Sequence, residues 1–191
     1  MLNTLLLNGA YADDPATEAV TTLATAELEE LGATVAAIRL RTQRIGYCQG
    51  DFECWIKTPG VCRADDDSRD IARRFINSDL VVFLTPLAFG GYGSELKRAV
   101  DKLICLVSPF FETIRGEVHH QPRYPRYPRL LGIGVSATDD PEPARIFRTL
   151  VARNAINMHA PAHAAGVVNG GAPNGARAEI RTLLSAVGVA R

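Results

Sequence analysis

Residues 79–101, with the sequence DLVVFLTPLAFGGYGSELKRAVD, decide the fold that we predict for this chain. The segment opens with a continuous apolar run at residues 80–84, bounded by Asp79 and Pro86. This run is too short for a membrane span and is typical of a strand buried on both faces. Strands of that kind belong to parallel sheets, so the run predicts a central parallel strand.

A short stretch of small and apolar residues, 86–91, follows this strand and precedes a predicted helix. Ser94 stands in front of the helix, whose apolar stripe is expected to consist of Leu96, Val100, Leu103 and Val107. A strand, an uncharged glycine-rich loop and a helix place the loop at the carboxyl edge of the sheet. Open α/β folds bind their ligands at that edge.

The pattern T-P-x-x-F-G-G-Y-x-S-E-L-K-x-x-x-D at residues 85–101 resembles the isoalloxazine loop of the flavodoxin-like, NAD(P)H-dependent FMN reductase family. In that family the loop after the third strand lies along the flavin ring. The resemblance implies that the ring is contacted by Pro86, Leu87, Ala88, Phe89, Gly90 and Gly91. A flat, largely apolar ring needs close backbone approach, which Gly90 and Gly91 permit. The alternative is an ordinary tight turn between a strand and a helix.

Composition sets the outer bounds on the class of protein. The chain has 191 residues, 47% of them hydrophobic, with 21 basic and 21 acidic residues. We expect one domain spanning residues 1–191, with enough length for a well-filled core. The charge balance indicates neither a nucleic-acid partner nor a membrane surface.

Targeting signals and cysteine usage bear on the cellular compartment. No apolar run approaches the roughly 18 residues of a membrane helix, and the amino terminus lacks the basic region and long apolar core of a secretory signal. The 4 cysteines are too few for a disulfide scaffold in a chain of this length. We therefore expect a cytoplasmic protein.

Predicted strands alternate with predicted helices along the rest of the chain. Strands are expected at residues 2–7, 34–40, 80–84, 130–135 and 164–168. Helices are expected after the caps Asp14, Asp67 and Asp140, after Ser94, and at residues 176–187. The helix after Asp140 should turn Ile146, Leu150 and Val151 inward. Residues 41–63 are expected to be a long functional loop, and residues 109–128 a proline- and arginine-rich insertion.

This alternation predicts an α/β fold with right-handed crossovers, in which helices cover both faces of a five-stranded parallel sheet as a three-layer sandwich. The family resemblance implies that the sandwich is flavodoxin-like and that its strand order is 2-1-3-4-5.

The loop after the first strand departs from the family pattern. In the family this loop wraps the FMN phosphate with hydroxyls, an arginine and backbone N–H groups. The resemblance implies contacts from Asn8, Gly9, Ala10, Tyr11 and Thr17. Residues 9–14, however, read GAYADD where the family has Gly-Ser and a basic residue. Two carboxylates disfavour a phosphate unless they point outward, and the alternative is a capped helix start without a ligand.

The cysteine segment, residues 48–62, reads CQGDFECWIKTPGVC and is similar to a C-x-G-C-F-x-C-W-x-K-T-P-G-x-C run of family members. Some relatives of those members hold an iron-sulfur cluster. Asp51 replaces one cysteine of the run, and Cys48, Cys54 and Cys62 form no C-x-x-C pair. We therefore expect no metal. The segment is expected to fold over the flavin edge or a dimer partner with Trp55 as its anchor, the alternative being buried inert thiols.

Two further segments carry weaker signals. Residues 132–137 spell G-x-G-x-x-A, but both glycines fall within a predicted strand, so we discount a dinucleotide-binding motif. Residues 136–139 are instead expected to form the third flavin-facing loop, with Ser136 and Thr138 as hydrogen-bond donors, or else a solvated loop.

The basic residues of 115–129 are expected to contact a nucleotide phosphate of NADPH or a second subunit rather than nucleic acid.

The resemblance implies an FMN-dependent NAD(P)H oxidoreductase that passes hydride from a nicotinamide nucleotide through FMN to a small acceptor such as a quinone or free flavin. Because the cofactor carries the chemistry, we expect no catalytic acid, base or nucleophile. The resemblance also implies a homodimer with flavin near the interface. The alternative is a flavodoxin-fold binding or regulatory subunit that has lost its flavin, which the acidic phosphate loop supports.

Overall fold

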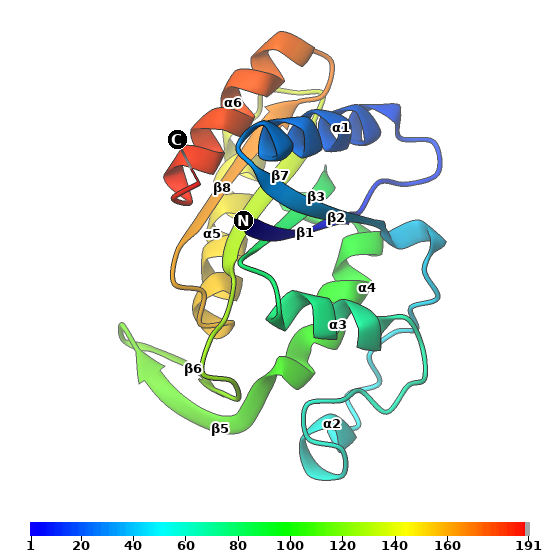
Figure 1. The fold of residues 1–191 in the computed structure, drawn as a ribbon, viewed down its shortest axis with the longest axis vertical. Helices are drawn as coiled ribbons and strands as arrows, with labels where there is room; N and C mark the ends of the chain where they lie inside the picture. The colour runs from blue at the N-terminus through cyan, green and yellow to red at the C-terminus, as the bar shows by residue number, and fades with distance from the viewer. Residues whose placement is uncertain (190–191) are drawn as a thin grey trace.

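The computed structural model describes residues 1–189 and is organised around a mostly parallel sheet (Figure 1). Its five parallel strands are β1 (Leu2–Asn8), β2 (Ala33–Arg39), β3 (Leu80–Ala88), β7 (Arg129–Ser136) and β8 (His163–Asn169). They lie in the order β2-β1-β3-β7-β8, which is 2-1-3-4-5 when the parallel strands are counted along the chain. The predicted fold class and strand order are therefore confirmed.

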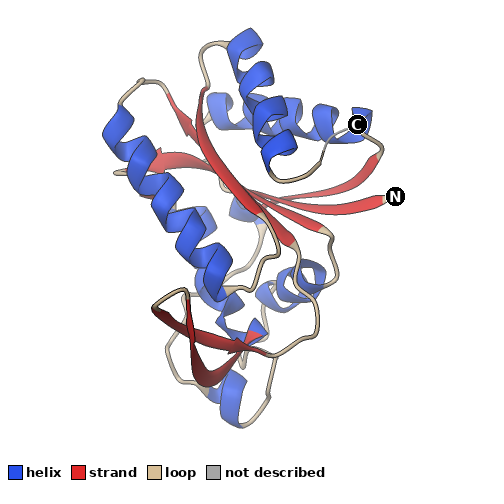
Figure 2. Cartoon of the chain, turned by 90° about the vertical axis from the view of Figure 1, so that its left-hand side faces the viewer, coloured by secondary structure: helices blue, strands red, loops and turns tan. Residues whose placement is uncertain are grey.

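Helices cover both faces of the sheet (Figure 2). One face carries α1 (Pro15–Glu30) and α6 (Pro173–Ala186). The other face carries α3 (Ser68–Ile76), α4 (Ser94–Lys102) and α5 (Pro141–Asn157). Within residues 1–189, no helix combines the length and the apolar character that crossing a membrane requires.

The central strands contribute alternate residues to two separate hydrophobic cores. On β1, Leu5 and Leu7 pack with α3, α4 and α5, whereas Leu6 packs with α1 and α6. All three leucines are buried. Burial on both faces explains why the central strands read as continuous apolar runs rather than as alternating patterns.

Two of the three predicted aspartate caps are confirmed. The Thr17 N–H donates to the Asp14 carboxylate (3.0 Å), and the Glu142 N–H donates to the Asp140 carboxylate (3.0 Å). A proline follows each cap at the first helical position, where its missing N–H costs nothing. The side chain of Asp67 does not cap α3, because it accepts a hydrogen bond from the N–H of Arg44 instead (2.7 Å).

The predicted stripe of α4 is wrong beyond Lys102. The helix gives way to a 3-10 turn, η2 (Leu103–Leu106), and Val107 begins the strand β5 (Val107–Ile114). Pro109 favours extended backbone at Ser108, the second residue of β5, because proline disfavours helical backbone in the residue before it.

The predicted insertion at residues 109–128 contains a second, two-stranded sheet. In it β5 pairs antiparallel with β6 (Glu117–Pro122). Arg115 and Gly116 close the hairpin with φ of 53° and 83°, as a two-residue turn between twisted strands requires. Residues 41–63 likewise are not all loop, since they include most of η1 (Leu40–Thr42) and the short helix α2 (Glu53–Ile56).

One inward-facing residue of α5 was also assigned wrongly. The buried positions of the helix are Phe147, Val151 and Ala155, whereas Ile146 is 39% exposed. The buried residues are spaced by four, so they lie on one face of the helix, and Ile146 lies beside that face.

Candidate functional site

The three loops predicted to face a flavin meet at one edge of the sheet. In the parallel register Asn8 pairs with Leu84, and Pro86 pairs with Val135. β3 and β7 continue a few residues beyond the end of β1, and the loops after all three strands leave the sheet on the same side. This is the carboxyl edge, where open α/β sheets bind ligands.

The first loop is packed tightly beneath α4. The Gly9 N–H donates to the carbonyl oxygen of Leu84 (2.7 Å), and a Cβ atom on Gly9 would lie 2.9 Å from the Cβ atom of Leu96. The Ala10 N–H donates to the side-chain oxygen of Asn8 (2.8 Å). Asn8, Gly9 and Ala10 are thus at the predicted edge, and their contacts shape the loop.

Tyr11 connects the first loop with the second. Its hydroxyl oxygen accepts a hydrogen bond from the N–H of Ser94, the first residue of α4 (3.2 Å). A Cβ atom on Gly93 would lie 2.9 Å from that hydroxyl and 3.1 Å from the ring of Pro86. The structure therefore brings Tyr11 and Pro86, both predicted site residues, to the same place.

The second loop is a hairpin rather than an open turn. β3 continues through Pro86, Leu87 and Ala88, and Ala88 pairs with Gly91 of β4 (Gly91–Tyr92). This corrects the prediction that the strand ends at Leu84. The two residues of the turn, Phe89 and Gly90, have φ of 50° and 80°, which the twist of a two-residue hairpin demands.

Phe89 stands fully exposed at the tip of this hairpin. A bulky residue with positive φ is a backbone outlier, and such outliers cluster at ligand sites, where the strain is offset elsewhere. Phe89 therefore presents an uncovered aromatic surface at the edge of the sheet where a ligand is expected.

Gly90 packs against the first turns of α5. A Cβ atom on Gly90 would lie 2.7 Å from the Cβ atom of Ile146 and 3.1 Å from the carbonyl oxygen of Pro143. The positive φ and this contact both require glycine, whether or not a ring approaches the loop.

The third loop holds its two predicted donors together. The Thr138 N–H donates to the Ser136 hydroxyl (3.1 Å), and the two hydroxyl oxygens lie 3.2 Å apart. A fourth segment, which carries no sequence signal for a site, also reaches this edge. A Cβ atom on Gly170, just after β8, would lie 2.8 Å from the Cβ atom of Ala16 at the start of α1.

Buried polar atoms without partners gather near the start of α1. Among the described residues, the buried side-chain atoms that lack a hydrogen-bond partner are Thr4 Oγ1, Asn8 Nδ2, Asp14 Oδ2 and Thr17 Oγ1. Asn8 ends β1, Asp14 caps α1 and Thr17 lies in the first turn of α1, so three of the four residues lie near the start of this helix. An unsatisfied buried polar atom is costly and calls for an explanation, such as a ligand.

The two halves of an FMN molecule fit this edge unequally. The hairpin with Phe89 at its tip suits a flat ring. The start of α1 does not suit a phosphate, because the Asp14 carboxylate already accepts the Thr17 N–H. Residues 8–17 include no lysine or arginine that would offset the repulsion between the two anions.

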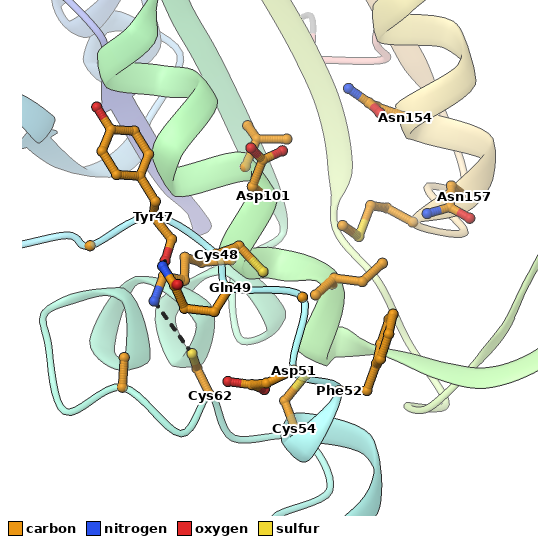
Figure 3. Close-up of a pocket in the computed structure, with 17 residues that line it drawn as sticks. Tyr47, Cys48, Gln49, Asp51, Phe52, Cys54, Cys62, Asp101, Asn154 and Asn157 are labelled. Atoms are coloured by element: carbon orange, nitrogen blue, oxygen red, sulfur yellow. Dashed lines mark hydrogen bonds between the residues drawn. The ribbon is translucent and has the colours of Figure 1, made fainter.

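The cysteine segment lines a different space. A cavity of about 610 Å³ lies between this segment, the end of α4 and the end of α5, and Cys48, Cys54 and Cys62 border it (Figure 3). Its lining includes none of the residues predicted to contact flavin. Trp55 anchors the segment as predicted, because its indole N–H donates to the carbonyl oxygens of Val107 (3.0 Å) and Ile104 (3.2 Å).

Lys102, which lines this cavity, belongs to a buried ion pair with Asp66. The ammonium nitrogen of Lys102 lies 3.4 Å from an Asp66 carboxylate oxygen and 3.6 Å from the sulfur of Cys62. Burial by itself raises the pKa of Asp66, but hydrogen bonds from Ser68 and Gly46 and the charge of Lys102 outweigh it and lower the pKa.

The four cysteines are free thiols. Burial raises the pKa of Cys105 to about 12 and also raises that of Cys54. In the part of the chain that the structure describes, no cluster of histidine, cysteine or acidic side chains is arranged to hold a metal ion.

The basic residues of 115–129 are largely used within the fold. Arg126 pairs with Asp79 (2.9 Å), Arg129 donates to the carbonyl oxygen of Gly188 (2.8 Å), and Arg123 donates to that of Cys105 (3.1 Å). These contacts hold the hairpin segment to the body of the protein, and the expected nucleotide-phosphate contact stays a prediction.

Comparisons with known proteins agree with this architecture. Two iron-sulfur flavoproteins of Archaeoglobus fulgidus are similar to the chain, one 28% identical over 78 residues (41% of this chain) and one 29% identical over 103 residues (54% of it). The chain spans only 34% and 52% of the lengths of these two relatives. Among solved structures, the NAD(P)H:quinone oxidoreductase from Methanothermobacter marburgensis superposes with a TM-score of 0.69 at 14% identity, over 97% of this chain and 95% of that one.

The family itself follows from a longer match. Residues 2–121, more than half of the chain, match the family described as NADPH-dependent FMN reductase. The match includes both the first loop and the β3–β4 hairpin, which carry the features described above. This chain belongs to the NADPH-dependent FMN reductase family.

Proposed function

We propose that this protein is an FMN-dependent NAD(P)H oxidoreductase that passes electrons to a small acceptor such as a quinone or free flavin. The observation that carries the proposal is the β3–β4 hairpin, whose exposed and backbone-strained Phe89 lies at the carboxyl edge of the sheet. The family membership supports it. When bound, the flavin supplies the hydride chemistry.

The roles proposed for this chain's residues are binding and orientation. The hairpin residues Pro86, Leu87, Ala88, Phe89, Gly90 and Gly91 would lie along the ring, and Ser136 and Thr138 would donate hydrogen bonds to its edge or to the ribityl chain. Tyr11, which bridges the first two loops, would hold them at a constant separation. Such a site orients a flat cofactor and leaves one face open to nicotinamide.

A binding experiment tests the proposal at Phe89. Titration of the purified protein with riboflavin and FMN should quench flavin fluorescence, and NADH or NADPH should then reduce a quinone in its presence. Phe89→Ala keeps a side chain on the strained backbone but removes the ring, and a ring contact of about 1 kcal/mol corresponds to roughly fivefold weaker flavin binding. Phe111→Ala removes another exposed ring, on the β5–β6 hairpin and outside the predicted ring site, and should leave binding unchanged. Equal binding by both variants would contradict this assignment of the ring site.

We also propose that the protein is a cytoplasmic homodimer. The free thiols support a reducing compartment. The β5–β6 hairpin and the cysteine segment expose Phe52, Ile56, Phe110, Phe111 and Val118, and exposed apolar side chains in such numbers favour burial against another subunit. Sedimentation of the native protein tests the dimer, and a monomer at micromolar concentration would refute it.

The second candidate function is a flavodoxin-fold binding or regulatory subunit without flavin. The observation that favours it is the acidic start of α1, where Asp14 takes the hydrogen bond that a phosphate would need. If neither riboflavin nor FMN binds to the folded protein, this function replaces the first.

A further inference from the structure

The N-terminus of α1 has few N–H groups left for an external anion. Pro15 has none, the Thr17 N–H donates to the Asp14 carboxylate (3.0 Å), and the Glu18 N–H donates to the Asp14 carbonyl oxygen (3.3 Å). Of the first four helical residues, only Ala16 has an N–H that is not used in these ways. In a helix that binds phosphate, these groups would point at the ligand.

A carboxylate therefore lies where a helix start would otherwise attract an anion. Asp14 is the N-cap, and its second oxygen, Oδ2, is buried without a hydrogen-bond partner within residues 1–189. The neighbouring Thr17 is fully buried, and its hydroxyl also lacks a partner. The same holds for the amide nitrogen of Asn8, at the end of β1. The turn thus combines a fixed negative charge with unused donors of the kind that a phosphate binds.

Among the residues that the structure describes, no arginine or lysine forms an ion pair with Asp14. The two arginines that reach α1 from the end of β2, Arg39 and Arg41, both pair with Glu18. Asp13, the other acidic residue of the loop, is exposed to solvent. Asp13 is therefore screened by water, whereas Asp14 acts directly on the helix start.

We propose that Asp14 substitutes for the cofactor phosphate at the start of α1, so that this chain selects flavins by their ring and not by their phosphate. The inference rests on the proposed flavin-binding function and concerns the specificity of the same site. It implies that riboflavin and FMN bind with dissociation constants within about threefold of each other. A site that recognised the phosphate would favour FMN strongly, because each charge-assisted hydrogen bond is worth about a tenfold change in affinity or more.

The test is a pair of titrations with three proteins. Riboflavin and FMN are titrated by fluorescence into wild type, Asp14→Asn and Asp13→Asn. Asn caps a helix as well as Asp does, so Asp14→Asn removes the charge and keeps the fold. Asp13→Asn removes the same charge one residue away on an exposed side chain and is the matched control. Asp14→Ser provides a second capping variant, and thermal unfolding confirms that every variant is folded.

The expected result is that Asp14→Asn tightens FMN binding by about tenfold and changes riboflavin binding by less than about threefold. The magnitude follows from removing a unit charge within a few ångströms of a doubly charged phosphate at a partly buried site. Asp13→Asn should change either affinity by less than about threefold. Asp14→Ser should behave as Asp14→Asn does.

Three results would overturn the inference, and they differ in whether they also contradict the proposed function. If both flavins bind and the ratio of their affinities is the same in wild type and Asp14→Asn, the inference fails while the proposed function stands. The same conclusion follows if wild type already prefers FMN by more than about tenfold. If neither flavin binds to wild type or to either Asp14 variant, the inference and the proposed function both fail.

Discussion

The contact between Gly90 and α5 leads to a sharp prediction about stability. Gly90→Ala places a Cβ atom 2.7 Å from the Cβ atom of Ile146 and 3.1 Å from the Pro143 carbonyl oxygen, on backbone with φ of +80°. The left-handed backbone costs a residue with a Cβ atom about 1–2 kcal/mol, and overpacking costs about 1–3 kcal/mol. We therefore expect the free energy of unfolding to fall by about 2–5 kcal/mol.

Gly32 is the control for the backbone contribution. Its φ is also +80°, and a Cβ atom there meets no other atom within 4 Å, so Gly32→Ala should cost only about 1–2 kcal/mol. The assay is urea unfolding of the flavin-free protein, followed by circular dichroism, with both variants compared to wild type. Equal destabilisation by the two variants would refute the expected overpacking, because it would mean that the hairpin can move away from α5 without loss of stability. It would also return Gly90 to the role first predicted for it, close approach to the ring.

Three further predictions concern acid stability, thiol reactivity and metal content. The hydrogen bond from the Asn3 N–H and the charge of Arg126 lower the pKa of Asp79, so this residue contributes stability above its unfolded pKa of about 3.9 that is lost as pH falls through the folded pKa. The free energy of unfolding of Asp79→Asn should therefore depend less steeply on pH below about pH 4. An unchanged pH dependence would count against the pairing of Asp79 with Arg126. In the native protein a thiol reagent should modify the exposed Cys48 first and leave Cys105 unmodified until the protein unfolds. The reason is that burial raises the pKa of Cys105 to about 12 and the thiolate is the reactive form. Peptide mass mapping that finds Cys105 labelled first would contradict this prediction. Anaerobically purified protein should contain no stoichiometric iron or acid-labile sulfide. Asp51 interrupts the cysteine run, and a carboxylate is a poor substitute for a thiolate as a ligand of an iron-sulfur cluster. Stoichiometric amounts of both iron and sulfide would refute this prediction.

Much of the fold could be predicted from local patterns. The apolar runs of β1, β3 and β7 are continuous because those strands are buried on both faces. The Asp-Pro pairs at Asp14 and Asp140 mark helix starts because capping and the missing proline N–H act within one turn. The strand order could not be predicted from local patterns, because the spacing of strands along the chain does not determine which strands pair. Its prediction depended on the family resemblance.

The errors occur where distant segments decide the outcome. Residues 109–128 show no clear strand pattern, because the β5–β6 hairpin projects from the main sheet and exposes Phe110 and Phe111. The extension of β3 into a hairpin depends on pairing with β4 and on the approach of α5 to Gly90. Neither contact leaves a periodic pattern in the sequence.

The sequence by itself determined that the chain forms alternating strands and helices, and it predicted that the loops after the first, third and fourth parallel strands carry the site. These properties depend on hydrophobic burial and capping, which act over a few residues. Only the tertiary structure decided how the first loop is held against the rest of the sheet edge, and that the cysteine segment borders a cavity away from the flavin edge. The partners that hold the first loop are Leu84, Leu96 and Ser94. Those partners are more than 70 residues away in sequence, so no local pattern records these contacts.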